Sequence, residues 1–204
     1  MFHPSKIIGI GTNYRAHAIE MGKGIPDEPL MFLKPTSALI LDGASIERPA
    51  GYARVDFEGE LGVVIGQRAR RVPRERALDV VAGFTCVNDV TVRDLQKKDG
   101  QWTRAKGFDT FCPVGPRIVP GLDPSNLRIR TRVDGVVRQD STTSDLIFDV
   151  PALVAFCSAV MTLEPGDIIS TGTPAGVGNL EPGNVVEIEI DGIGVLRNPV
   201  IARP

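Results

Sequence analysis

The sequence predicts a β-rich α+β fold with a few short helices. Short apolar runs rich in Val and Ile recur along the chain, and Gly and Pro residues separate them, as is typical of strands joined by turns. Helical spacing of apolar residues is clearest in the segment that follows Asp149. Beyond that segment, strand patterns dominate the rest of the chain.

The length and composition indicate one compact domain. A chain of 204 residues can bury most of its apolar surface in one core, so we expect a single catalytic domain over residues 1–204. The composition is 42% hydrophobic and 24% charged, which is ordinary for a globular protein and leaves little room for a long disordered region.

The elements of the first half follow from turn residues and apolar runs. Proline favours the first turn of a helix, and Asn is a good N-cap. Alternation of apolar and polar residues is strongest in the run VDFEGELGVVIG. The predicted elements are a strand at 6–11, a short helix at 14–21 capped by Asn13, extended pieces around Pro35 in 30–41, a strand at 55–66, and a helix at 73–81 that begins with Pro73.

The second half contains two near copies of one turn, Leu-Glu-Pro-Gly-Asp at 163–167 and Leu-Glu-Pro-Gly-Asn at 180–184. Pro-Gly at the centre favours type II geometry, because Pro presets one φ and Gly accepts the positive one. We expect each turn to lead into a hairpin. The other predicted elements are a strand at 83–90, a short polar helix at 91–98, and a helix that starts at Asp149-Val150-Pro151.

The charge and the apolar pattern point to small-molecule partners. The formal net charge is −2, so no global field attracts nucleic acid or anionic lipid. The longest apolar stretch, 150–163, is shorter than the roughly 20 residues of a membrane span. The N-terminus has no basic segment followed by an apolar run, and the three cysteines are scattered. We therefore expect a protein of the reducing cytoplasm, without membrane or nucleic-acid binding.

Glu58 and Glu60 form the first candidate functional cluster. On a strand, alternate side chains share a face, so these two carboxylates lie roughly 6 to 7 Å apart. Like charges that close are costly when partly buried, unless a cation or a proton lies between them. A strand with one solvated face gives the same pattern, so the pair alone leaves both interpretations open.

Asp89 extends this cluster. It ends the predicted strand FTCVNDV, where a side chain can project into a cleft. Three carboxylates from two strands can form an oxygen site, which selects hard cations such as Mg²⁺, Mn²⁺ or Ca²⁺. With His3 and His17 as the only histidines and no close cysteine pair, a tetrahedral zinc site is not expected.

Five segments, in order, resemble the fumarylacetoacetate hydrolase family. They are GTNYRAHAIE, FEGELGVVIG, NDVTVRDLQ, WTRAKGFDTFCPVGP and LEPGDIISTGTPAGVG, and the likeness runs from about Ile8 to Asn198. It implies a mixed β-roll fold, a homodimer, and one Mg²⁺ or Mn²⁺ per subunit held by Glu58, Glu60 and Asp89. It covers the catalytic core, so we do not expect the additional N-terminal domain of eukaryotic fumarylacetoacetase. Ala16 departs from the family pattern, because many members carry Asp there.

The resemblance also assigns catalytic residues. His17 and Glu20 stand three apart on the predicted helix, so their side chains share a face. A surface pair has the same spacing, but in this family such a pair activates water, and we carry that role over. A carboxylate bound to one ring nitrogen makes the other a better base. Lys106 matches a lysine that contacts the substrate, where a cation stabilises a carboxylate or an enolate.

Four more residues are expected to bind the substrate. Gln96 matches a position that touches bound acid in family members, and Thr173 can donate a hydroxyl hydrogen bond to a carboxylate. Arg15 and Arg93 are assigned to the same role, although Arg93 can equally make structural ion pairs only. The glycines after Thr173 do not match a phosphate-binding loop, since no Gly-Lys-Ser/Thr follows.

The resemblance therefore implies a metal-dependent hydrolase that cleaves the C–C bond of a 2,4-dioxo acid. An acylpyruvate would give pyruvate and a carboxylic acid, and a fumarylacetoacetate-like substrate would give an acetoacetate-type product. The small members of the family leave two alternatives: decarboxylation of oxaloacetate, and isomerisation or decarboxylation of an unsaturated 2-hydroxy or 2-oxo dioate such as a hydroxyheptadienedioate. A non-catalytic protein that binds small acids is a further alternative.

Overall fold

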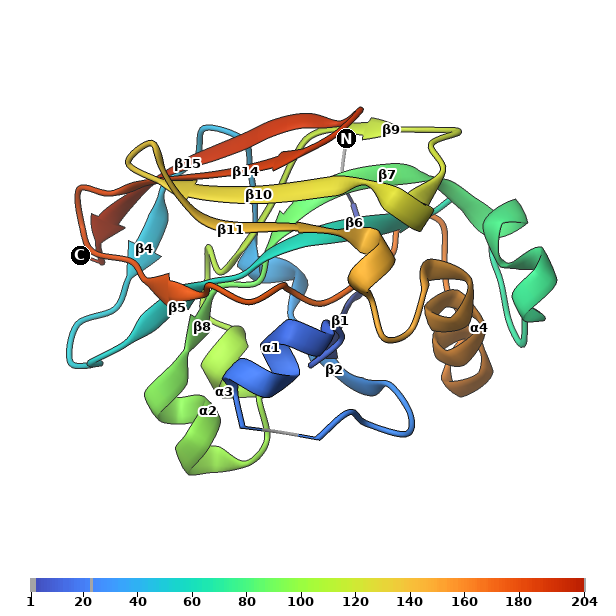
Figure 1. Ribbon diagram of the computed structural model, residues 1–204, viewed down its shortest axis with the longest axis horizontal. Coiled ribbons are helices and arrows are strands. Elements are labelled where there is room, and N and C mark those ends of the chain that lie inside the picture. Colours follow the sequence, from blue (N-terminus) through green and yellow to red (C-terminus); the bar gives the residue numbers. More distant parts are fainter. Residues whose placement is uncertain (1–2, 23, 204) are drawn as a thin grey trace.

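The computed structural model describes residues 3–22 and 24–203, and its longest sheet has seven strands (Figure 1). Most neighbours in this sheet are antiparallel, but β1 runs parallel to β12 and β3 runs parallel to β9. The strands are β1 (Ile7–Gly11), β2 (Leu30–Lys34), β3 (Leu39–Leu41), β6 (Gly59–Ile65), β7 (Val81–Asn88), β9 (Cys112–Val119) and β12 (Ile168–Ser170), in the spatial order β2-β1-β12-β6-β7-β9-β3.

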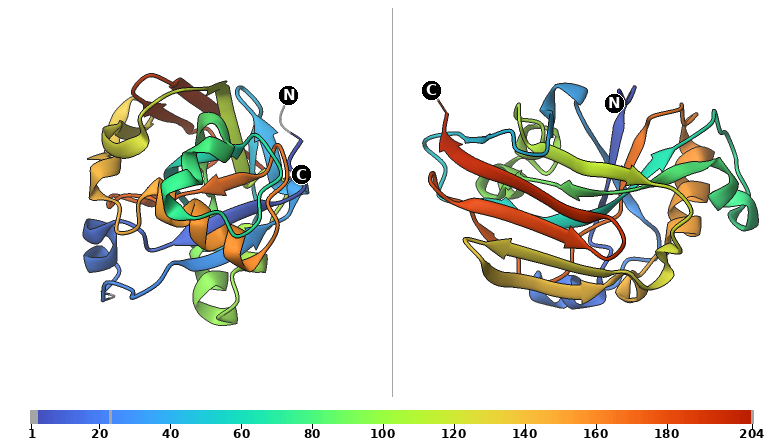
Figure 2. Two further views of the ribbon diagram at one scale, coloured as in Figure 1. Left: turned by 90° about the vertical axis from the view of Figure 1, so that its right-hand side faces the viewer. Right: turned by 90° about the horizontal axis from the view of Figure 1, so that it is seen from above.

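A five-stranded sheet lies over the first one, as the view from above shows (Figure 2). It consists of β11 (Val136–Thr142), β10 (Arg128–Val133), β14 (Val185–Ile190), β15 (Gly194–Ala202) and β4 (Ile46–Arg48), in that spatial order. Buried side chains of both sheets, such as Leu61 and Ile188, form one apolar cluster. The core therefore lies between the sheets, and the mixed, β-rich α+β fold is confirmed.

A third, small sheet and the helices complete the fold. The small sheet joins β13 (Gly178–Asn179), β5 (Val55–Phe57) and β8 (Thr91–Val92). The α-helices are α1 (Arg15–Glu20), α2 (Arg93–Asp99), α3 (Thr103–Lys106) and α4 (Val150–Val160), and the 3₁₀ helices are η1 (Thr36–Ala38), η2 (Arg74–Val80), η3 (Pro124–Asn126) and η4 (Thr143–Asp145). Helices α1, α2 and α3 gather on one side, whereas α4 packs with η2 at one end (Figures 1 and 2). No helix in the described ranges is long and apolar enough to cross a membrane.

Three local predictions need correction. The run 55–66 is not one strand, because it breaks at Glu58 into β5 and β6, which belong to different sheets. The helix predicted at 73–81 is the 3₁₀ helix η2. Asn13 does not cap α1, whose N-cap is Tyr14. Its buried amide instead bonds to the backbone of Phe148 and to the carbonyl of Thr171, so tertiary partners use the groups that a cap requires.

The two Pro-Gly turns form as predicted, but the first does not lead into a hairpin, whereas the second does. Gly166 and Gly183 have positive φ values of 89° and 98°. The amide of Asp167 donates to the carbonyl of Glu164, and the amide of Asn184 donates to the carbonyl of Glu181, each at 3.0 Å. The first turn, however, leads into β12, which pairs with β1 and β6. The second leads from β13, which pairs with β5, into β14, which forms the predicted antiparallel hairpin with β15 and also pairs with β10. The first turn therefore joins α4 to β12, and the second joins two strands that belong to different sheets.

Asp167, at the end of the first turn, ties the start of β1 to β12. Its buried carboxylate accepts the amides of Ser5 (2.9 Å), Lys6 (3.1 Å) and Glu164 (2.8 Å), and it pairs with the ammonium of Lys6. Burial alone would raise the pKa of this carboxyl, but the hydrogen bonds from Glu164, Lys6 and Ser5 together lower it below its usual value.

We expect Asp167→Asn to lower the free energy of unfolding by about 2 kcal/mol at pH 7, because an amide places a donor against these donors. Since the pKa is lowered by folding, the stabilisation is present above the unfolded pKa of about 4 and is lost as the pH falls through the folded value. Urea denaturation between pH 7 and pH 2 measures the difference, which should shrink below about pH 4.

The matched control is Asp123→Asn, since Asp123 is an exposed carboxylate that accepts a single amide, that of Ser125 at 3.0 Å. A loss for Asp167→Asn no larger than that of the control would contradict the anchoring role of Asp167.

Candidate active site

The break at Glu58 brings three acids together. The amide of Glu58 donates to the side chain of Asn88 at 3.0 Å, and the amide of Asp89 donates to the carbonyl of Glu58 at 2.9 Å. The end of β7 is thus bonded to the junction of β5 and β6. One carboxylate oxygen from each of Glu58, Glu60 and Asp89 lies within 4.8 Å of the others. The predicted convergence of the three acids is therefore present.

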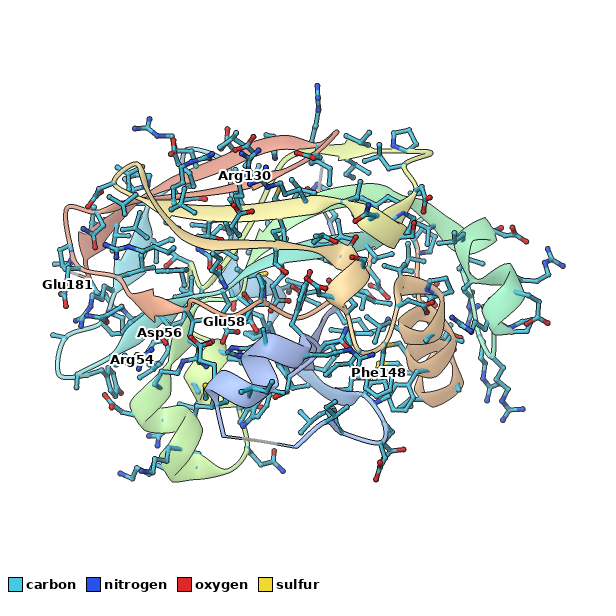
Figure 3. The ribbon with its side chains drawn as sticks, viewed as in Figure 1. Arg54, Asp56, Glu58, Arg130, Phe148 and Glu181 are labelled. Atoms are coloured by element: carbon cyan, nitrogen blue, oxygen red, sulfur yellow. The ribbon has the colours of Figure 1, made fainter. Side chains whose placement is uncertain are left out.

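All three acids are buried, with exposed fractions of 5% for Glu58, 1% for Glu60 and 1% for Asp89. The alternative of a solvated strand face is therefore wrong. Glu58 lies with its neighbour Asp56 between the strands and the helices α1 and α2 (Figure 3). Because buried like charges repel each other strongly, this cluster needs positive charge nearby.

Gly59 separates the two glutamates because the five-stranded sheet leaves no room for a side chain there. A Cβ on Gly59 would lie 2.2 Å from the hydroxyl oxygen of Thr131 on β10 and 3.2 Å from the amide oxygen of Gln139 on β11. The spacing Glu-Gly-Glu therefore reflects close contact between the sheets directly behind the acids.

Two buried lysines supply part of the positive charge. The Lys106 ammonium on α3 donates to Glu58 (2.8 Å), Asp89 (2.5 Å) and the Thr91 hydroxyl (2.8 Å). The Lys34 ammonium at the end of β2 donates to the other oxygen of Asp89 (2.7 Å) and to the carbonyl of Lys106 (2.5 Å). Burial would lower the pKa of Lys106, but Asp89 and Glu58 raise it above its usual value, so this amine stays protonated.

Glu58 and Glu60 have opposite electrostatic surroundings. Burial would raise the pKa of Glu58, but Arg93 and Lys106 hold it far below its usual range. Burial, Asp89 and Glu58 raise the pKa of Glu60 to about 8, although Ser170 (2.6 Å) and the amide of Gly172 (2.9 Å) donate to its carboxylate. The Glu60 side of the cluster is thus short of positive charge.

This donor set fits a divalent cation. Three buried carboxylates converge from the β5–β6 junction and the end of β7, and the member with the raised pKa would be stabilised as an anion by a cation beside it. Oxygen donors without sulfur or imidazole suit hard ions. The three cysteines are buried and free, and none belongs to the cluster.

His17 and Glu20 form the predicted pair on α1. The Nδ1 atom of His17 lies 2.9 Å from a carboxylate oxygen of Glu20, and the other oxygen of Glu20 accepts the amide of Gly176 at 3.1 Å. His17 is 5% exposed and lines the same cleft as Glu58, Glu60 and Lys106. With Nδ1 engaged by Glu20, Nε2 is the nitrogen available to accept a proton.

Three of the four residues assigned to substrate binding also line the cleft: Arg93, Gln96 and Thr173. The Arg93 guanidinium bonds to Asp56 (2.7 Å), Glu58 (2.5 Å) and Gln96 (2.8 Å). Its ion pairs therefore hold the carboxylates of Asp56 and Glu58 in place.

Thr173 and Arg15 differ from the simplest expectation. The Thr173 hydroxyl donates to the carbonyl of Gly59 at 2.9 Å and accepts from Gln139 at 2.7 Å, so donation to a substrate requires rotation of this hydroxyl. Arg15 is exposed at the start of α1 and is not among the residues that line the cleft. Its assignment stays a prediction.

The sequence reasoning missed Lys34, Ser170 and Gln139. Lys34 carried a usable signal, because a single charge in the apolar run Leu-Met-Phe-Leu-Lys-Pro is expected to have a buried partner. Ser170 and Gln139 carried none, since each looks like an ordinary polar residue of a strand. Ser170 finds its partner on the adjacent strand β6, and Gln139 finds its partner through the contact between the two sheets.

Comparisons with known proteins find one matching family and several similar chains. The family model described as fumarylacetoacetate (FAA) hydrolase C-terminal matches residues 6–201. The mitochondrial oxaloacetate decarboxylase of Dictyostelium discoideum is 44% identical over 195 residues, which are 92% of this chain and 89% of that protein.

Two solved structures are also similar. The 5-carboxymethyl-2-hydroxymuconate delta-isomerase from Mycobacterium smegmatis has a TM-score of 0.94 and 53% identity, covering 100% of this chain and 81% of that one. The fumarylpyruvate hydrolase from Pseudomonas aeruginosa, in complex with Mn²⁺ and pyruvate, has a TM-score of 0.92 and 35% identity, covering 99% and 91%.

We expect Lys34→Met to lower the free energy of unfolding by about 3 kcal/mol in a chelating buffer, because it leaves the buried Asp89 with one cationic partner fewer. The control is Lys6→Met, which also removes an ammonium from a buried aspartate, Asp167, but at a position where the lysine side chain is 19% exposed. That variant should lose only about 1 kcal/mol. Chemical denaturation gives both values, and equal losses would show that Lys34 is an ordinary ion pair.

Proposed function

As the chain belongs to the fumarylacetoacetate hydrolase family, we propose that it is a divalent-metal-dependent hydrolase that cleaves the C–C bond of a 2,4-dioxo acid. The preferred substrate class is the acylpyruvates, which give pyruvate and a carboxylic acid. The observation that carries the proposal is one cleft lined by the acids Glu58 and Glu60, the Lys106 ammonium and the His17 imidazole.

The proposed cofactor is Mg²⁺ or Mn²⁺, one per subunit, with Glu58, Glu60 and Asp89 as its protein ligands. The oxygen donors support this choice, and so does the fumarylpyruvate hydrolase of similar structure that was solved with Mn²⁺ and pyruvate. When bound, the ion supplies Lewis-acid polarisation of the 2-oxo acid.

His17, Glu20 and Lys106 transfer the proton and stabilise the developing charge. Glu20 orients His17, whose Nε2 takes a proton from a water molecule. The oxygen of that water attacks the 4-carbonyl carbon of the substrate. The C3–C4 bond then breaks, its electrons pass to the pyruvate fragment as an enolate, and the acyl fragment leaves as a carboxylic acid. The Lys106 ammonium stabilises the enolate charge, and protonation at C3 yields pyruvate.

The remaining assignments concern binding. Gln96 lines the cleft, and Arg93 holds Gln96 in place through a 2.8 Å hydrogen bond. We assign Gln96, Arg93 and Thr173 to the carboxylate of the substrate, and Arg15 to its approach from solvent. The proposed protein acts in the cytoplasm as a homodimer.

Decarboxylation of oxaloacetate is the second candidate. It is favoured by the 44% identity to the Dictyostelium oxaloacetate decarboxylase, and it needs enolate stabilisation but no attacking water. Isomerisation of an unsaturated dioate is supported in the same way by the similar isomerase structure. Activity on the different substrates distinguishes these reactions from one another, and any turnover would exclude a non-catalytic acid-binding protein.

We expect the purified protein with Mg²⁺ or Mn²⁺ to release pyruvate from acylpyruvates faster than from oxaloacetate. A panel of acylpyruvates, oxaloacetate and unsaturated dioates, read by pyruvate detection and by absorbance of the dioates, measures this. Chelation should abolish turnover and either ion should restore it. Failure to hydrolyse any acylpyruvate would overturn the leading proposal, whatever the other substrates show.

His17→Ala should reduce kcat for acylpyruvate hydrolysis by about a thousandfold, because it removes the general base. It should change any decarboxylation of oxaloacetate by less than about tenfold, since that reaction needs no activated water. The exposed His3 gives the control, and His3→Ala should leave both rates unchanged. Equal losses of both activities in His17→Ala would contradict the water-activating role.

A further inference from the structure

Gln139 lies outside every segment that carries the proposed chemistry, yet its side chain bonds to the site from behind. It belongs to β11, the edge strand of the five-stranded sheet, and is 1% exposed. Its amide oxygen accepts the amide of Gly59, the residue between the two glutamates, at 3.1 Å. Its amide nitrogen donates to the hydroxyl of Thr173 at 2.7 Å and to the carbonyl of Pro174 at 2.8 Å. One carboxamide therefore links the acidic strand to the segment 171–178.

The segment 171–178 runs between β11 and α1, where it appears in orange-red (Figure 1). On the α1 side, the amide of Gly176 donates to Glu20 at 3.1 Å. On the β11 side, a Cβ on Gly176 would lie 2.1 Å from the carbonyl oxygen of Arg138, and its φ of 99° also disfavours any side chain. The segment 171–178 is thus fixed on one face by β11 and bonded on the other face to the carboxylate of Glu20.

The carboxylates of the three acids bond to other residues than Gln139. Glu60 is held by Ser170 and Gly172, Glu58 by Arg93 and Lys106, and Asp89 by Lys34 and Lys106. What depends on Gln139 is the placement of Thr173 and Gly176 relative to those acids. A small displacement of groups that orient a substrate or a base has a large effect on rate.

We propose that Gln139 is a positioning residue that holds Thr173 and the segment 171–178 against the start of β6, and so fixes Thr173 and Glu20 at their working distance from the ion-binding acids. This inference rests on the proposed function for its catalytic consequence, but its structural part stands by itself.

The decisive variant is Gln139→Met, which keeps the shape of the side chain and removes all three hydrogen bonds. The matched control is Asn198→Leu on β15, because Asn198 is also a buried carboxamide and donates to two carbonyls, those of Leu41 (3.0 Å) and Ala44 (2.8 Å), away from the cleft. Both variants should lower the melting temperature, since each leaves buried backbone groups unpaired.

The two variants should differ in function. Gln139→Met should lower kcat/KM for the acylpyruvate that the wild type hydrolyses by at least about tenfold, while Asn198→Leu stays within about threefold of wild type. The affinity for Mn²⁺, measured by the EPR signal of the free ion, should stay within about threefold in both. A fall in Mn²⁺ affinity as large as the fall in kcat/KM would overturn the proposal, because Gln139 would then support the acids directly.

A double-mutant cycle with Thr173→Val tests the path. If Gln139 acts through Thr173, Gln139→Met should change kcat/KM by less than about threefold in the Thr173→Val background. Effects that simply multiply would contradict this path.

A readout without turnover separates this inference from the proposed function. Amide hydrogen exchange of residues 171–178 should become faster in Gln139→Met and stay unchanged in Asn198→Leu. If the wild type hydrolyses no acylpyruvate, the proposed function fails, and pyruvate binding to the Mn²⁺-loaded variants replaces kcat/KM in the comparison. Unchanged exchange in Gln139→Met would overturn the positioning role whether or not the enzyme turns over.

Discussion

Three carboxylates buried within 4.8 Å of one another are the constraint on which the rest of the site depends. Such a group repels itself strongly in a protein interior, so the fold has to bring cations to it. Lys106, Lys34 and Arg93 come from α3, β2 and α2, three elements that are separate in the chain. Even with these partners, Glu60 keeps a raised pKa. The remaining deficit of positive charge marks the side of the cluster that suits a divalent ion.

The break between β5 and β6 is what makes this arrangement possible. A continuous strand would place Glu58 and Glu60 on one face and leave Asp89 at the end of a neighbour. At the break, the backbone of Glu58 instead bonds to both Asn88 and Asp89. Close packing of β10 and β11 on Gly59 closes the back of the site. Glu58 and Glu60 therefore face a cleft on the other side, which His17 of α1, Gln96 of α2 and Lys106 of α3 also line.

Whether a residue's partners are near it or far from it in the chain separates the predictions that succeeded from those that failed. The acid pair, Asp89 and the His17–Glu20 pair were predictable, because each lies in a short segment that resembles the family, although their spacing alone left other interpretations open. The N-cap role of Asn13 and the hairpin after the first Pro-Gly turn were wrong, because partners more than a hundred residues away bind the same groups. The partners of Lys34, Ser170 and Gln139 were not predictable, since their importance comes from which strands lie side by side.

By itself the sequence determined the β-rich class and the type II turns, because these follow from residue type and short spacing, and its resemblance to a family indicated which acids and bases belong to one site. Only the tertiary structure decided that the acids are buried, that Glu58 and Glu60 differ in pKa, and that the Thr173 hydroxyl is already engaged. These properties depend on the distances between side chains of strands that are far apart in the chain. No local pattern of residues encodes those distances, because they are fixed only when the sheets pack against each other.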